Sequence, residues 1–185
     1  MVTVADSGRA CQPSTSGHLR YRPRMTWAED FYRAQRDLLP GTPAVEVERE
    51  RLAQVTVHAG AGPRRVLELG GGAGGFAVAA AEVGHDVTMI ELVSALAEDA
   101  RRAAAAAGVG ARVRVICGDF AAVDLAGGFD VVCYWDGFGV GADADQAGLL
   151  GRVRAWLGRD GCALLDIYQP RYWAAAAGHA GARPP

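Results

Sequence analysis

The sequence predicts an α/β protein with a doubly wound parallel sheet of five strands in the order 3-2-1-4-5. Three observations support this fold. From residue 64 onward, short apolar segments alternate with helical segments, and a run of glycines directly follows the first apolar segment. The length of 185 residues fits one domain. Strands that are apolar throughout are typical of a parallel sheet covered on both faces, and right-handed crossovers then favour the doubly wound arrangement.

Five segments have the composition of buried strands, and helical segments lie between them. The predicted strands cover 65–69, 86–91, 113–117, 129–135 and 162–168, and the helices between them cover 76–83, 94–107 and 143–157. Two further helices precede this region. Thr26 and Glu29 form a capping-box pattern that opens a helix through Asp37, and Thr42 with Pro43 opens another that ends near His58.

The chain divides into a flexible Gly/Ser/Pro-rich arm at 1–24, one domain at 25–175 and a tail at 176–185. The net charge of −2 offers no basic excess for nucleic acid, and no segment resembles a membrane span or a secretory signal. We therefore expect a cytoplasmic protein with neither nucleic acid nor a membrane as its partner. Its 19 basic residues are all arginine, which excludes mechanisms that need lysine.

Neither the cysteines nor the histidines form a cluster that would hold a metal ion. The four cysteines make no CxxC pattern, so no metal site is predicted. The four histidines are isolated, and we expect each of them, His85 included, to be solvated rather than catalytic.

The glycine run after the first strand is the strongest functional feature. Such a loop lets the backbone approach a ligand closely, and the following helix offers free N–H groups to a nucleotide or a carboxylate. The spacing is ambiguous, because Gly70, Gly72 and Gly75 satisfy GxGxxG while Gly70, Gly72 and Gly74 satisfy GxGxG.

Three acidic residues at the ends of neighbouring strands narrow the choice. Glu68 precedes the glycines at the end of a buried strand, where an unpaired carboxylate is costly and should have a partner. Glu91 ends the second strand, where it can accept hydrogen bonds from ribose hydroxyls. Asp119 follows the third strand, where it can accept from an adenine amino group.

Together these residues resemble class I methyltransferases that use S-adenosylmethionine. The family's (D/E)-x-G-x-G-x-G motif is matched by residues 68–74, its acidic residue after strand two by Glu91, and its Gly-Asp after strand three by Gly118-Asp119. Residues 129–139 look like its fourth motif, and 157–165 look like its L-x-P-G-G-x-L-L segment, with Arg159-Asp160-Gly161 replacing Pro-Gly-Gly. The resemblance implies a Rossmann-like fold over roughly residues 25–175.

The resemblance also implies a role for each matched residue. The glycine backbone would approach the methionine half of the cofactor, Glu68 would orient the loop, and Glu91 would take the ribose hydroxyls. The adenine would lie against hydrophobic side chains with its amino group on Asp119, and Trp135 would line the methionyl end. The implied cofactor-binding set is Glu68, Gly70, Gly71, Gly72, Gly74, Glu91, Leu92, Asp119, Phe120 and Trp135. The alternative for Leu92 and Phe120 is that they are ordinary core residues.

Methyl transfer from a sulfonium needs alignment and desolvation, and a general base only if the acceptor must lose a proton early. Candidate bases near the strand ends are Asp136 and Tyr134, together with Tyr32 and Asp30 from the first helix. No (N/D)-P-P-(Y/F) motif follows strand four, and the chain contains no Asn, so a small-molecule acceptor is favoured over nucleic acid or a magnesium-dependent catechol. The acceptor atom stays open.

The end of the chain departs from the family pattern. Family members carry two more strands that form an antiparallel hairpin beside strand five, and here we expect that hairpin to be missing and the chain to be carboxyl-terminally short. Strand five would then be an open edge prone to self-association. Two alternatives remain: a catalytically impaired cofactor-binding or partner subunit, and a nicotinamide (NAD) dehydrogenase, which Glu68, Gly118-Asp119 and the lack of lysine disfavour.

Overall fold

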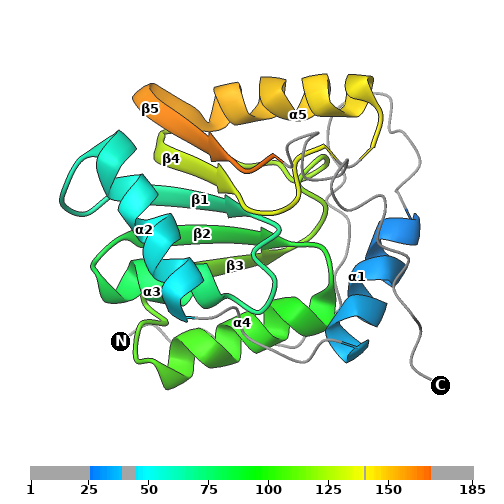
Figure 1. Cartoon of the computed structure of the whole chain (residues 1–185), viewed down its shortest axis with the longest axis horizontal. Helices are drawn as coiled ribbons and strands as arrows, with labels where there is room; N and C mark the ends of the chain where they lie inside the picture. The colour runs from blue at the N-terminus through cyan, green and yellow to red at the C-terminus, as the bar shows by residue number, and fades with distance from the viewer. Residues whose placement is uncertain (1–25, 39–44, 140, 168–185) are drawn as a thin grey trace, which may run out of the picture.

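A computed structural model describes residues 26–38, 45–139 and 141–167 of the chain. Its centre is a five-stranded parallel sheet in the order β3-β2-β1-β4-β5, which confirms the predicted topology (Figure 1). The strands are β1 (Arg65–Leu69), β2 (Asp86–Glu91), β3 (Val113–Cys117), β4 (Phe129–Tyr134) and β5 (Leu157–Leu165).

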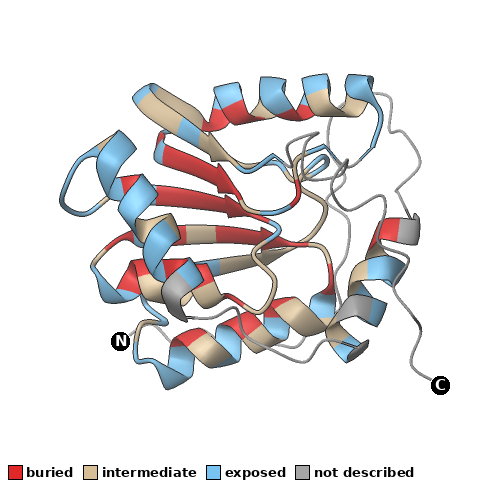
Figure 2. Cartoon of the chain, viewed as in Figure 1, coloured by how far each residue is buried: buried red, intermediate tan, exposed pale blue. Residues whose placement is uncertain are grey.

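Helices cover the sheet on both faces. On one face, α2 (Val45–Ala59), α3 (Gly75–Glu82) and α4 (Ser94–Ala106) pack around Phe76 and Met89. On the other face, α5 (Asp143–Trp156) packs through Trp156 against Leu67 and Val132. The central strands β1 and β4 are buried almost throughout, as Figure 2 shows. This burial is the reason their sequences are apolar on both faces.

The connection from β3 to β4 contains no helix. Residues 118–128 cross the α5 side of the sheet as irregular chain, and Phe120, Val123 and Leu125 pack into the core on that side. Arg152 of α5 donates hydrogen bonds to the carbonyl oxygens of Phe120, at 2.9 Å, and Val123. The arginine thus supplies donors for carbonyl groups that a regular helix would have paired internally.

Strand β5 differs most from its predicted range of 162–168. It begins at Leu157, which pairs with Phe129, and the pairing resumes at Val131 opposite Cys162. Residues 158–161 therefore form an irregularity opposite Asp130, and the strand ends at Leu165. For five other elements, the predicted ends lie within one or two residues of the observed ones. These elements are α1 (Thr26–Leu38), α3, α4, β4 and α5.

Helix α1 lies beyond the carboxyl ends of the strands, beside α4 (Figure 1). An ion pair of 2.9 Å between Arg36 of α1 and Asp99 of α4 joins the two helices. Among the described helices, none is long and apolar enough to cross a membrane. The arm at 1–24, the tail at 176–185, the predicted cap at Thr42 and the predicted domain limits at 25 and 175 lie outside the described residues.

His85 is an exception to the expectation that the histidines are solvated, because it is 6% exposed. Its Nδ1 accepts a hydrogen bond of 3.1 Å from the backbone N–H of Arg64. Burial, and then the charge of Arg64, lower the pKa of His85. The residue is a neutral structural acceptor in the turn before β2.

Candidate functional site

The glycine loop connects β1 to α3 at the carboxyl edge of the sheet. Gly70, Gly72 and Gly74 adopt positive φ angles of 63°, 57° and 84°, a region that costs other residues about 1–2 kcal/mol. The backbone N–H of Gly70 donates to the carbonyl oxygen of Ile90 at 2.8 Å, which ties the loop to β2. The sequence folds into this tight turn because these three positions carry no side chain.

The glycines of this loop serve different contacts. A Cβ on Gly71 would lie 2.6 Å from Cγ of Met89 and 2.8 Å from Oε2 of Glu68, so the Glu68 carboxyl sits directly against the loop. A Cβ on Gly74 would lie 2.8 Å from Cβ of Ala100, so Gly74 lets α3 and α4 pack closely. A Cβ on Gly72 would meet none of the described residues within 4 Å. Gly72 therefore presents the open side of the loop, where a ligand has room.

Glu91 anchors the same loop from β2. Its carboxylate accepts hydrogen bonds from the backbone N–H groups of Gly72 at 2.9 Å and of Val93 at 2.8 Å. Burial raises the pKa of Glu91, and the backbone hydrogen bonds oppose that rise. The backbone N–H of Leu92 also acts on this carboxylate. Since a carboxylate can accept about four hydrogen bonds, at least one acceptor position remains for a ligand hydroxyl.

Glu68 is 2% exposed, and its Oε2 has no hydrogen-bond partner among the described residues. The partner that the sequence predicts for this carboxyl is thus not supplied by the part of the chain that the structure describes. Burial raises the pKa of Glu68 to about 8, with a further contribution from the negative charge of Glu48 and an opposing one from Arg51. Such an oxygen beside an open glycine cradle fits a ligand that carries a positive group.

Two residues of α2 belong to this site although the sequence did not predict them. Glu48 is 6% exposed, and its Oε1 accepts a hydrogen bond of 3.3 Å from Arg51. Arg51 also pairs with Asp136, and its guanidinium carbon lies 5.4 Å from the ring centre of Trp135. A signal was present, because Glu48 and Arg51 continue the helical stripe of Leu52, Val55 and Ala59 that faces the core.

Tyr134 closes the other face of the site. The Tyr134 ring packs against two glycines: a Cβ on Gly70 would lie 3.3 Å from the ring, and a Cβ on Gly137 would lie 2.2 Å from it. The Phe120 ring meets the Tyr134 ring edge-on, with 5.4 Å between the ring centres. Burial, followed by Tyr32, raises the pKa of Tyr134. The phenol therefore stays protonated at neutral pH and can donate a hydrogen bond, but it is a poor base.

The remaining predicted residues surround these groups. Asp119 uses Oδ1 to accept a 2.8 Å hydrogen bond from the backbone of Ala121. Leu92 follows Glu91 and is half-buried, and Trp135 meets the Phe76 ring at 5.3 Å. Asp136 has a φ of 57° and is exposed, and Tyr32 of α1 is half-buried.

Asp166, after β5, is a further acidic residue at this edge that the sequence did not indicate. Burial and then the charge of Asp136 raise its pKa. The structure thus brings side chains together at the carboxyl ends of the strands. They come from α1, α2, β1 and β2 and from the segments that follow β3, β4 and β5.

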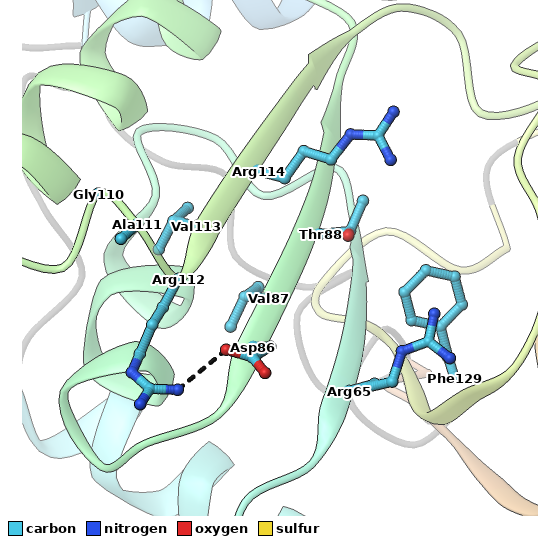
Figure 3. Close-up of a pocket in the computed structure, with 10 residues that line it drawn as sticks. All are labelled: Arg65, Asp86, Val87, Thr88, Gly110, Ala111, Arg112, Val113, Arg114 and Phe129. Carbon is cyan, nitrogen blue, oxygen red and sulfur yellow. Dashed lines mark hydrogen bonds and ion pairs between the residues drawn. The ribbon is translucent and has the colours of Figure 1, made fainter. Parts of the chain in front are cut away.

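A separate pocket of about 430 Å³ lies at the other end of the strands from the glycine loop (Figure 3). It is lined at the amino-terminal ends of the strands by residues that include Arg65, Asp86, Arg112 and Arg114. Arg112 pairs with Asp86 at 2.9 Å. No residue of the predicted site lines this pocket, so it is distinct from the glycine cradle.

Comparisons with known proteins agree with this geometry. Residues 66–161, more than half of the chain, match the family model described as a methyltransferase domain. The CcbJ methyltransferase from Streptomyces caelestis is 30% identical with a TM-score of 0.61, and the match covers 74% of this chain and 54% of that one. A search of curated proteins finds no match.

Two further solved structures were obtained with ligands. The glycopeptide N-methyltransferase MtfA, complexed with sinefungin, is 28% identical with a TM-score of 0.56, over 62% of this chain and 51% of that one. A SAM-dependent methyltransferase from Geobacter sulfurreducens, in complex with S-adenosyl-L-homocysteine, is 26% identical with a TM-score of 0.53. The match covers 68% of this chain and 48% of that one. The chain spans about half the length of these three proteins.

Proposed function

Because the chain belongs to the methyltransferase domain family, we propose that it binds S-adenosylmethionine and transfers the methyl group to a small-molecule acceptor. The observation that carries this proposal is the cradle at the carboxyl edge of β1. There Gly71 lies against Oε2 of buried Glu68, which has no partner among the described residues, and the open backbone of Gly72 follows. Ligands of doubly wound sheets bind at this edge.

Residues along the carboxyl ends of the strands support this proposal. Glu68 offers an acceptor for the ammonium of the methionyl group, and Glu91 keeps at least one acceptor position for a ribose hydroxyl. Asp119 and Phe120 follow the neighbouring strand β3, where the adenine would lie. Structures of two similar methyltransferases hold sinefungin or S-adenosyl-L-homocysteine, which supports the same ligand class for this chain.

When bound, S-adenosylmethionine supplies a methyl group that its sulfonium has already activated. The chain's own residues then need to align the acceptor and exclude water. The ring of Trp135, which already has the Arg51 guanidinium 5.4 Å from its centre, would line the methionyl end. Helix α1 lies beyond the carboxyl ends of the strands, beside α4. Tyr134 can donate a hydrogen bond to the acceptor, and Asp136 and Tyr32 are the remaining candidates to receive a proton.

A second candidate function is cofactor binding without turnover, in an impaired or partner subunit. It is favoured by the state of the candidate bases, since the pKa of Tyr134 is raised and Asp136 is held by Arg51. Methyl transfer measured against a panel of amines and alcohols separates it from the first proposal. Turnover of any acceptor with stoichiometric S-adenosylhomocysteine production would exclude it.

The proposal also covers the partners of the protein, its location and its self-association. Absence of a basic surface excess supports small molecules rather than nucleic acid as partners, and a cytoplasmic location is proposed on the same sequence features. Within the described sheet, β5 hydrogen-bonds only to β4, so we also propose self-association along the β5 edge.

The direct test is a thermal shift with S-adenosylmethionine, S-adenosylhomocysteine and NAD. Both forms of the cofactor should raise the midpoint of unfolding, because ligands stabilise the state they bind. NAD should leave the midpoint unchanged. A rise with NAD alone would overturn the proposed function.

A further inference from the structure

Building on the proposed cofactor site, we propose that Glu48 and Glu68 together bind the α-ammonium group of S-adenosylmethionine. We also propose that its arrival expels a proton that the two carboxyl groups hold in the free protein. Glu48 is thereby a second cofactor-binding carboxyl, contributed by α2, whereas Glu68 comes from β1.

The two carboxyl groups share an unusual state. Both residues are more than nine-tenths buried, at 6% and 2% exposed, and each has an Oε2 without a hydrogen-bond partner among the described residues. Oε1 of Glu48 is taken by Arg51, which leaves Oε2 as its unused acceptor. Buried polar atoms are nearly always paired, so two unpaired carboxyl oxygens in one cluster indicate a missing donor.

The location fits a donor that enters from the glycine loop. Oε2 of Glu68 lies against Gly71, next to the open side of Gly72. The charge of Glu48 acts on Glu68, and Arg51 links Glu48 to the carboxyl end of β4 through Asp136. An ammonium group has three donors and can serve both carboxyl groups at once.

The charges around the pair are unbalanced. Glu48 and Arg51 come from α2, Glu68 from β1, Glu91 from β2, and the neutral Cys133 thiol from β4; Asp136 follows β4. The pair and the charged groups that act on it therefore comprise four carboxyl groups and one arginine. Burial raises the pKa of Glu48 and, with the charge of Glu48, the pKa of Glu68 to about 8, so the pair holds a proton at neutral pH.

The exchange balances in charge and atoms. The proton leaves one carboxyl group for the solvent, the carboxylate stays, and the cofactor's ammonium keeps its three hydrogens and takes the proton's place. A nearby positive charge lowers the pKa of a carboxyl group, so the bound state is ionised. The affinity for a ligand with an ammonium should then rise nearly tenfold from about pH 6 to 7 and less steeply toward pH 8, where Glu68 and the α-amino group of the ligand both titrate. A ligand without an ammonium shows no such rise.

The experiment is calorimetric titration of the full chain near pH 7 in phosphate and in Tris, which differ in ionisation enthalpy. The ligands are S-adenosylhomocysteine and its deamino analogue, which lacks only the ammonium. We expect close to one proton released per S-adenosylhomocysteine and none with the analogue. Glu48→Gln should bind S-adenosylhomocysteine about tenfold more weakly and release less proton, with unchanged affinity for the analogue. Glu50→Gln, on the exposed side of α2, is the matched control and should behave as wild type.

The outcomes are separable. Equal proton release with both ligands, or equal affinity of Glu48→Gln and Glu50→Gln for S-adenosylhomocysteine, would overturn this inference and leave the proposed function standing. No binding of S-adenosylhomocysteine to wild type would overturn the proposed function itself. The comparison of two ligands on the wild type decides the question even if Glu48→Gln folds poorly.

Discussion

Replacing Gly72 by alanine tests whether the open side of the glycine loop is ligand space. Gly72 has a φ of 57°, and a Cβ there would meet no atom of the described part of the chain within 4 Å. Gly108, at the end of α4, has a φ of 73° and equally open surroundings. The two alanine variants therefore share the same backbone strain, and they differ only in whether the new methyl group points into the proposed cofactor site.

The magnitudes separate the two effects. Both variants should lose about 1–2 kcal/mol in free energy of unfolding, since alanine is strained at positive φ. Only Gly72→Ala should lose affinity for S-adenosylhomocysteine. A methyl group forced into a close contact costs about 1–3 kcal/mol, which corresponds to a loss of roughly five- to 150-fold.

Urea denaturation measures the first quantity and calorimetric titration the second. The reasoning predicts similar denaturation midpoints for Gly72→Ala and Gly108→Ala, with wild-type binding retained only by the second. If Gly72→Ala binds S-adenosylhomocysteine as tightly as Gly108→Ala, the open side of Gly72 does not face the cofactor.

Three further variants test single residues. Glu91→Ala should weaken S-adenosylhomocysteine binding about ten- to a hundredfold in titration calorimetry, since charged hydrogen bonds are lost and Gly72 loses its acceptor; unchanged affinity would argue against the ribose role. Burial raises the pKa of Glu68 to about 8, so the free energy of unfolding should fall between about pH 4.5 and 8 as this carboxyl is forced to ionise. Glu68→Gln should reduce this dependence of the free energy of unfolding on pH. At pH 7 it should raise the free energy of unfolding, measured by urea titration, by about 2–4 kcal/mol. Because the pKa of His85 is lowered, its contribution to stability is present above about pH 6.5 and is lost below it. His85→Gln should reduce the decline in melting temperature from about pH 6.5 to 5, and an identical decline would remove His85 as its source.

The sequence predicted the features that local chemistry determines. The continuous apolar runs gave β1, β2 and β3 at their observed limits, and the glycine spacing located the turn at the edge of the sheet. These patterns could be recognised because strand burial and positive φ each restrict residue type within a few positions.

What the sequence missed depends on contacts between distant segments. Glu48 and Arg51 lie about twenty residues before the glycine loop, and only the docking of α2 places them beside Glu68 and Trp135. The burial of His85 likewise follows from its hydrogen bond to the turn before β1. A charged residue within the apolar stripe of a helix is the one local sign that such docking leaves.

The most direct test of the cofactor site is amide NMR of the labelled chain titrated with S-adenosylhomocysteine. Saturable shifts should appear at the backbone amides of Gly70, Gly71, Gly72 and Leu92, at the carboxyl edge of the sheet. The amides of Gly110 and Arg112, at the pocket on the opposite edge, should not move. Shifts confined to Gly110 and Arg112, with none in the glycine loop, would contradict the placement of the cofactor argued from Glu68, Gly72 and Glu91.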